Sequence, residues 1–99
     1  MNYILTRTSD QAVLALEGHF DAQAASRLRA LTSLLHLDPP KSLVIDFDRV
    51  SFLGSAGVGV LLLLRKEIQK LEGKMSLVNV SPDIRKVFDL AGLSAPFGL

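Results

Sequence analysis

The sequence contains no cysteine, and its formal net charge is only +1. Without cysteine there are no disulfides and no thiolate metal sites, which is typical of a reducing cytosol. So small a net charge provides no basic field for nucleic acid. The longest apolar run, Val58 to Leu64, is far too short to span a bilayer, and the N-terminus lacks the pattern of a signal peptide. We therefore expect a cytoplasmic protein with no nucleic-acid partner and no membrane insertion.

What is present is the composition of one globular domain: 99 residues, 48% of them hydrophobic and 21% charged. Hydrophobic periodicity, with Gly and Pro at the boundaries, predicts seven elements. Strands are expected at 3–8, 12–17, 42–47 and 75–80, and helices at 21–38, 55–72 and 82–91. The order β-β-α-β-α-β-α predicts an α/β fold, residues 1–99 forming a single domain. We expect a mixed four-stranded sheet that opens with an antiparallel hairpin and carries three helices, mostly on one face.

The chain is organised around residues 43–64. The continuous apolar run that ends at Phe47 predicts a strand buried on both faces, at the centre of the sheet. A short polar turn and a Gly/Ser loop then lead into the long helix. Ser55 is expected to cap that helix, and a helix N-terminus carries a partial positive charge. If the protein has a switch or a contact point, this loop is the predicted place.

The long helix has more apolar residues than one core stripe needs. At 100° per residue, Leu61, Leu64 and Ile68 fall on the core side, with Gly57 and Val60. Val58 and Leu62 fall elsewhere and are predicted to be exposed. Single exposed apolar residues are ordinary, but two of them directly after the loop favour a contact with a partner.

No pattern in the sequence supports an enzyme. The glycines of residues 54–59 match neither a phosphate-binding loop, nor a dinucleotide fingerprint, nor a nucleophile elbow. His19 and His36 have no neighbouring carboxylate pair with metal-ligand spacing. Asp46 and Asp48 could pair as acid and base, but Asp at such positions more often shapes a turn by accepting backbone N–H groups. We predict no catalytic residue, no metal and no cofactor.

Three segments together resemble one family. Gly18-His19-Phe20-Asp21-Ala22 is similar to a Gly-x-Leu-Asp-Ala turn. Residues 43–52 resemble the strand and turn that precede a phosphorylation loop, and residues 55–61 resemble Ser-Ser-Gly-Leu-Gly-x-Leu. With the β-β-α-β-α-β-α order, the whole chain resembles STAS domains, in particular bacterial anti-sigma factor antagonists.

The resemblance implies a partner-switching regulator of transcription. Such an antagonist binds an anti-sigma factor that is also a GHKL-type serine kinase, and so frees a sigma factor. Phosphorylation of a Ser at the start of the long helix ends the complex, and a PP2C-like phosphatase restores it. The implied partner-binding residues are Asp21, Gly54, Ser55, Ala56, Gly57, Val58 and Leu62. The alternative is a STAS subunit that is not phosphorylated and binds the ATPase of a bacterial lipid-transport ABC system.

Two positions depart from the commonest family pattern. Gly54 stands where many members have Asp, and Ala56 stands where the second Ser, often the phosphoacceptor, would be. Three explanations are open: Ser55 is the acceptor, the domain has lost phosphorylation control, or Ala56 is an introduced substitution that holds the partner-binding state. We favour Ser55 as the acceptor and place Ser51 second.

Overall fold

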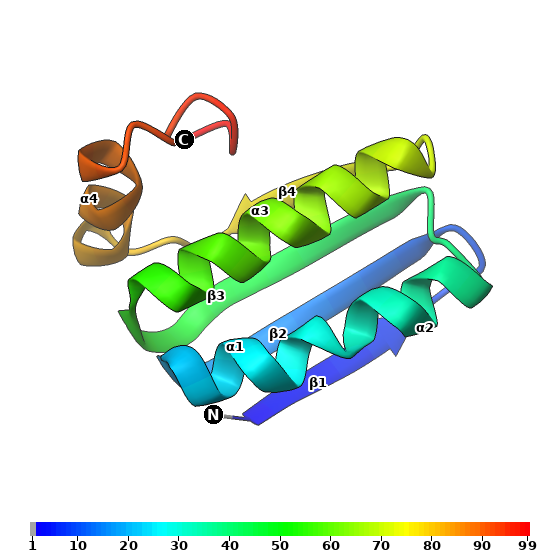
Figure 1. Ribbon diagram of the computed structural model, residues 1–99, viewed down its shortest axis with the longest axis horizontal. Coiled ribbons are helices and arrows are strands. Elements are labelled where there is room, and N and C mark those ends of the chain that lie inside the picture. The colour runs from blue at the N-terminus through cyan, green and yellow to red at the C-terminus, as the bar shows by residue number, and fades with distance from the viewer. Residues whose placement is uncertain (1) are drawn as a thin grey trace.

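The computed structural model describes residues 2–99 and has four strands and four helices (Figure 1). In chain order they are β1 (Asn2–Arg7), β2 (Gln11–Phe20), α1 (Ala22–Arg29), α2 (Leu31–Leu37), β3 (Ser42–Leu53), α3 (Ser55–Lys70), β4 (Lys74–Val78) and α4 (Pro82–Leu90). The predicted first helix is therefore divided at Ala30, into α1 and α2. Ala30 keeps helical dihedral angles, φ −64° and ψ −25°, so the division is small and the predicted element order otherwise holds.

The strands form one sheet in the order β1-β2-β3-β4. β1 pairs antiparallel with β2, whereas β2 with β3 and β3 with β4 are parallel. The opening hairpin and the mixed four-stranded sheet are thus confirmed. The parallel pairs require crossovers, which α1 with α2 and α3 supply. Figure 1 shows these helices on one face of the sheet, as the sequence predicted.

The core lies between the sheet and that layer of helices. Alternate residues of β2 and β3 point inward and are fully buried, and α3 places Leu61, Leu64 and Ile68 against them. At one end, Phe88 of α4 packs edge-on against Phe47, with ring centroids 6.4 Å apart. Phe88 also meets Phe97 of the C-terminal segment at 5.2 Å, so this segment, which shows no pattern in the sequence, joins the core.

The polar turn expected after Phe47 does not form, and that prediction is wrong. β3 continues to Leu53 because a bulge accommodates an extra residue in this strand. Ala15 pairs with Asp46, but Glu17, two residues on, pairs with Arg49, three residues on. The carboxylate of Asp46 accepts the Asp48 backbone N–H at 2.9 Å and the Asn79 side-chain amide at 3.0 Å. Asp46 therefore holds the backbone, as expected for that residue type, and does not pair with Asp48 as acid and base.

Two further boundaries differ from the sequence prediction. β2 does not end at Gly18, which adopts φ 100° within the strand, and pairing continues to Phe20. The left-handed residue after α3 is Glu72, with φ 63°, rather than Gly73. The first difference extends β2 to the start of α1 and so brings the chain to the candidate site. The second makes α3 shorter than predicted, since it ends at Lys70. No helix within residues 2–99 is long and apolar enough to cross a membrane.

Candidate functional site

One hydrogen bond joins two segments that are far apart in the sequence. The backbone N–H of Gly54 donates to the carbonyl of Phe20 at 3.0 Å. This bond ties the end of β3 to the end of β2, so that α1 and α3 begin side by side (Figure 1). Asp21 directly follows Phe20, and Ser55 directly follows Gly54. The structure thus brings together the two motifs on which the predicted partner surface rests.

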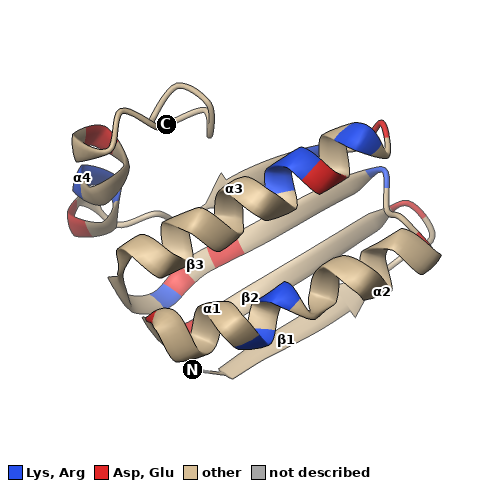
Figure 2. Cartoon of the chain, in the orientation of Figure 1, with Lys and Arg blue, Asp and Glu red and all other residues tan. Residues whose placement is uncertain are grey.

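The start of α3 is exposed and uncharged. Gly54 occupies the N-cap position, with φ −93° and ψ 172°, and has no side chain with which to cap the helix. Ser55 is the first helical residue, not the cap, so the prediction that Ser55 caps α3 is wrong. The side chains of Ser55 and Ala56 lie in solvent. Residues 55–64 contain no charged residue, and Figure 2 shows the first half of α3 without charge.

Gly57 faces the interior, unlike Ser55 and Ala56. A methyl group added there would lie 2.8 Å from the side chains of Leu53 and Phe20 and 2.9 Å from the Phe20 carbonyl. Real contacts of that kind are essentially never so short, and a backbone atom cannot move aside easily. Gly57 is therefore required for α3 to approach the end of β2, and it offers no side chain to a partner.

The predicted exposure of Val58 and Leu62 is wrong. Val58 is buried, with 8% of its surface accessible, and Leu62 is half-buried against the core. Both share one side of α3 with Arg65, at positions i, i+4 and i+7. The Arg65 Nε donates to the Pro96 carbonyl at 3.0 Å, which places the C-terminal segment along this side. That segment has no periodicity in the sequence, so its cover over α3 could not be anticipated.

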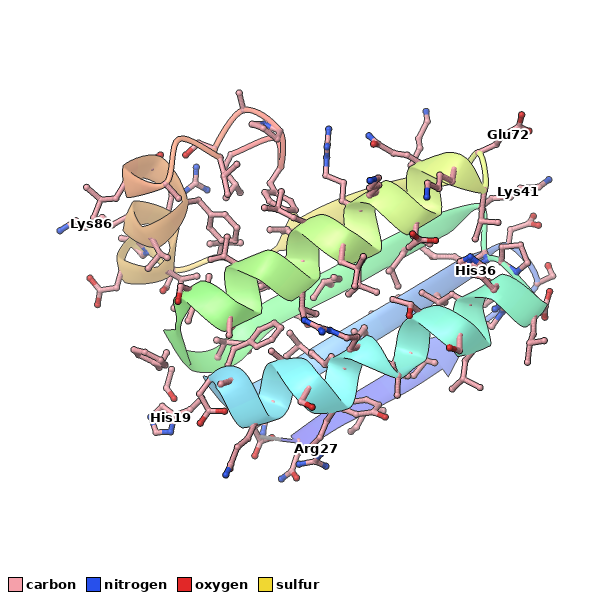
Figure 3. All side chains as sticks on the ribbon, in the orientation of Figure 1. His19, Arg27, His36, Lys41, Glu72 and Lys86 are labelled. Carbon is pink, nitrogen blue, oxygen red and sulfur yellow. The ribbon has the colours of Figure 1, made fainter. Side chains whose placement is uncertain are left out.

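Two exposed residues beside the loop were missed by the sequence reading. Phe52 keeps 49% of its surface accessible, and its ring lies edge-on to His19, with centroids 6.0 Å apart. Figure 3 shows His19 projecting from this end of the molecule, near the start of α1. Val50 and Leu53 are both buried although they stand three residues apart, because a bulge breaks the strand alternation and turns Phe52 outward; no pattern in the sequence marks this bulge. The apolar residue beside Ser55 is thus Phe52.

Asp21 supplies the negative charge at this end. Its Oδ1 accepts the backbone N–H of Ala24 at 3.0 Å, so Asp21 caps α1 as predicted. This hydrogen bond lowers the pKa of the Asp21 carboxyl, which stays ionised and exposed at neutral pH. The carboxylates of Asp21 and Glu17, with His19 and Arg27, line a shallow hollow of about 300 Å³.

The exposed residues at this end of the molecule offer groups that a partner could contact. Among residues 2–99, no three His, Asp or Glu side chains gather in a way that could hold a metal ion. His36 contacts one carboxylate, Glu67, at 3.0 Å, and so links α2 to α3 on the side of the molecule away from the loop. What the exposed residues offer is a hydroxyl at a helix start, a ring and a carboxylate.

Comparison with known proteins agrees with this arrangement. Residues 3–98 match the family described as STAS domain. The Anti-sigma F factor antagonist of Lysinibacillus sphaericus is 31% identical over 87 residues, covering 87% of this chain and 74% of that protein. The structure of the anti-sigma factor antagonist SpoIIAA in its unphosphorylated form superposes with a TM-score of 0.86 at 32% identity, covering 97% of this chain and 84% of the other.

The phosphorylated form of SpoIIAA, a Bacillus cell fate determinant, superposes with a TM-score of 0.78 at 33% identity, over 97% of this chain and 87% of the other. Both forms of that relative thus share the fold of this chain. The family match covers nearly every residue described, and the loop, helix start and Asp21 turn lie where the resemblance placed them. The chain belongs to the STAS domain family, with relatives named anti-sigma factor antagonists.

Proposed function

We propose that this protein is an anti-sigma factor antagonist that binds its partner through the start of α3 and is released by phosphorylation of Ser55. The observation that supports this most is the exposed Ser55 hydroxyl at the first position of a helix, beside Asp21 and Phe52. On this proposal the domain is a binding protein, and its partner, a GHKL-type anti-sigma kinase, supplies the chemistry. A PP2C-like phosphatase reverses the modification.

Charge explains how one phosphate could end the complex. A phosphoserine adds about −1.5 to −2 charges. The first half of α3 carries no charge, so the phosphate and Asp21 would dominate the field at this surface. Any partner fitted to the neutral loop and the Phe52 ring would meet a desolvation cost and repulsion. The fold itself tolerates the phosphate because the helix N-terminus favours anions.

Ser55 is a better acceptor than Ser51 on geometric grounds. Ser51 lies within β3, between Val50 and Phe52, which both pair with β2. Ser51 is the unpaired residue of a bulge and is exposed, but paired sheet residues flank it on both sides, whereas Ser55 opens α3 at a corner of the molecule. Ala56 has no hydroxyl, so the position that often carries the phosphate in relatives cannot be phosphorylated here. Ser55 therefore takes that role in our proposal.

The partner surface is revised by the burial of Val58 and Leu62. Its exposed members are Ser55 and Ala56, next to the half-buried Gly54, with Asp21 on one side and Phe52 on the other. Aromatic rings are enriched where binding energy concentrates at interfaces. We assign the apolar anchor to Phe52.

The test is phosphosite mapping after incubation with the anti-sigma kinase and ATP. We expect phosphate on Ser55, none on a Ser55→Ala variant, and unchanged incorporation on Ser51→Ala. Phosphate on Ser51, or none at all, contradicts the assignment. Affinity purification from the native cell tests the partner class. Stable recovery of a transporter ATPase without phosphorylation would instead support the lipid-transport subunit.

A further inference from the structure

Exposed apolar residues gather on a side of the molecule that the proposed function does not use. Among residues 2–99, eight large hydrophobic residues stay exposed, and five of them lie on β1 and α2. They are Tyr3 (37%), Ile4 (69%), Leu5 (40%), Leu34 (57%) and Leu37 (83%). Ile4 alternates with Leu5 and faces the other side of the sheet, whereas Leu5 and Leu34 line the same narrow apolar crevice, so that β1 and α2 form one surface there. We call it the β1 edge surface.

β1 is also an open edge of the sheet, since only β2 pairs with it. The Thr8 N–H donates to the Gln11 carbonyl at 2.9 Å, and the register is continuous from Asn2 to Arg7. Hydrogen-bonded residues alternate along an antiparallel pair. The backbone groups of the even-numbered residues of β1 therefore face β2, and those of Tyr3, Leu5 and Arg7 point outward.

This edge lacks the devices that usually prevent strands from pairing between molecules. Natural edge strands carry Lys, Pro, a bulge or an inward charge. β1 contains no Lys and no Pro, and its register has no bulge. Its one charge, Arg7, contacts the Asp38 carboxylate at 3.4 Å within the same chain. The edge is thus free to pair, and its charge is already balanced.

We propose that two copies of this chain associate through β1, antiparallel, about a two-fold axis at Leu5. In this register Tyr3 lies opposite Arg7 of the partner subunit, and Leu5 lies opposite Leu5 of the partner subunit. It is the register that uses all three outward-facing residues of the strand. A single strand that pairs with itself antiparallel gives the isologous contact that a two-fold dimer requires.

Charge favours a second copy as the occupant. The two Arg7 residues lie about four residues apart along the pair, on the order of 14 Å, so they do not repel strongly. Each Arg7 stays paired with Asp38 of its own chain and lies opposite Tyr3 of the partner subunit, whose ring attracts a guanidinium. Leu34, which shares a crevice with Leu5, flanks the new strand pair and excludes water from it on that face.

The association is expected to be weak. Stable interfaces bury about 1,200–2,000 Å² in total, and one six-residue edge with two flanking leucines covers less. We expect a monomer–dimer equilibrium in the range of about 10 µM to 1 mM. The loop at Ser55 follows β3, two strands away, so pairing through β1 leaves both loops accessible and the two proposals independent.

Single-cysteine crosslinking tests the register, since the native chain has no cysteine. Opposed Cα atoms of a hydrogen-bonded pair lie about 5.5 Å apart, within the range that a disulfide needs. Leu5→Cys should therefore crosslink to a dimer under a copper–phenanthroline oxidant. Thr6→Cys sits one residue off the axis, about 8 Å from its copy, and should crosslink at least about 10-fold more slowly. Leu90→Cys, on α4, measures random collision.

Sedimentation velocity of the cysteine-free protein tests the association itself. We expect a concentration-dependent shift that Leu5→Arg abolishes, because two like charges would then face each other at the axis. Leu90→Arg, at a residue that is 90% exposed, should behave as the unmodified chain. Leu5→Cys crosslinking no faster than Leu90→Cys, or a monomer at all concentrations, overturns the proposal. Faster crosslinking by Thr6→Cys overturns the register.

Discussion

The two sides of the start of α3 differ sharply in exposure, although their residues are neighbours in the sequence. Ser55 and Ala56 lie in solvent, whereas Gly57 and Val58 are buried. The inner side packs α3 against Phe20 and Leu53, and the outer side is accessible to a binding partner or a modifying enzyme. Gly57 and Val58 therefore serve the fold, and only the side with Ser55 and Ala56 is available to a partner.

The largest expected effect comes from placing a charge on the inner side. Val58→Asp would bury an unpaired carboxylate, and we expect it to lower the free energy of unfolding by more than about 2 kcal/mol. Urea unfolding followed by circular dichroism measures this. Phe52→Asp is the matched variant on the outer side: it should leave the unfolding midpoint nearly unchanged and weaken capture of the anti-sigma partner. Equal stability of Val58→Asp and the unmodified protein would erase the distinction between the two sides.

A smaller effect separates two glycines of the same helix. Gly57→Ala forces contacts of 2.8 Å with Leu53 and Phe20. We expect a loss of about 1–3 kcal/mol from this overpacking. At Gly59 an added methyl group meets no heavy atom within 4 Å outside its own helix backbone. Gly59→Ala should therefore gain about 0.5–1 kcal/mol through helix propensity.

In the same urea titration, Gly57→Ala should lower the free energy of unfolding and Gly59→Ala should raise it. A stabilised Gly57→Ala variant would mean that α3 can withdraw from the end of β2 without cost. In that case the hydrogen bond between Gly54 and Phe20, rather than close packing, would be what positions the loop. Hydrogen exchange at the Gly54 amide would then show which contact persists.

Periodicity was sufficient for most of the fold. The order of strands, the hairpin and the core stripe of Leu61, Leu64 and Ile68 follow from apolar spacing and from Gly and Pro boundaries. The structure brings the Asp21 turn and the loop at Ser55 together through the bond between Gly54 and Phe20, and the resemblance had named residues from both. These are local or strongly patterned features, and such features are readable in a single sequence.

What could not be predicted depends on contacts without a pattern. The hydrogen bond from Arg65 to the Pro96 carbonyl holds the C-terminal segment at the side of α3 that carries Val58 and Leu62, and nothing periodic in residues 94–99 predicts it. The bulge that turns Phe52 outward arises from a mismatch between β2 and β3, which exists only once the strands are paired. For these two reasons the sequence analysis assigned the apolar part of the partner surface to Val58 and Leu62, whereas the exposed apolar residue is Phe52.

The smallest expected effect concerns the charge beside the loop. Because the Ala24 N–H holds the pKa of Asp21 below its ordinary value, Asp21 stabilises the folded state above the unfolded pKa of about 3.9. That contribution is lost as the pH falls through the lower, folded pKa. Asn caps helices about as well as Asp but does not titrate. The unfolding midpoint of the unmodified protein should therefore fall more steeply than that of Asp21→Asn as the pH drops below about 4.

The difference between the two urea midpoints, taken at each pH, isolates this group from the other carboxylates, which both proteins share. Asp21 is exposed, so solvent screens the effect and a small difference is expected. Parallel curves for the two proteins would show that Asp21 is not held by α1. The Asp21 carboxylate would then be free to move relative to Ser55, and its repulsion of a phosphate there would be weaker than that of a carboxylate fixed by the cap.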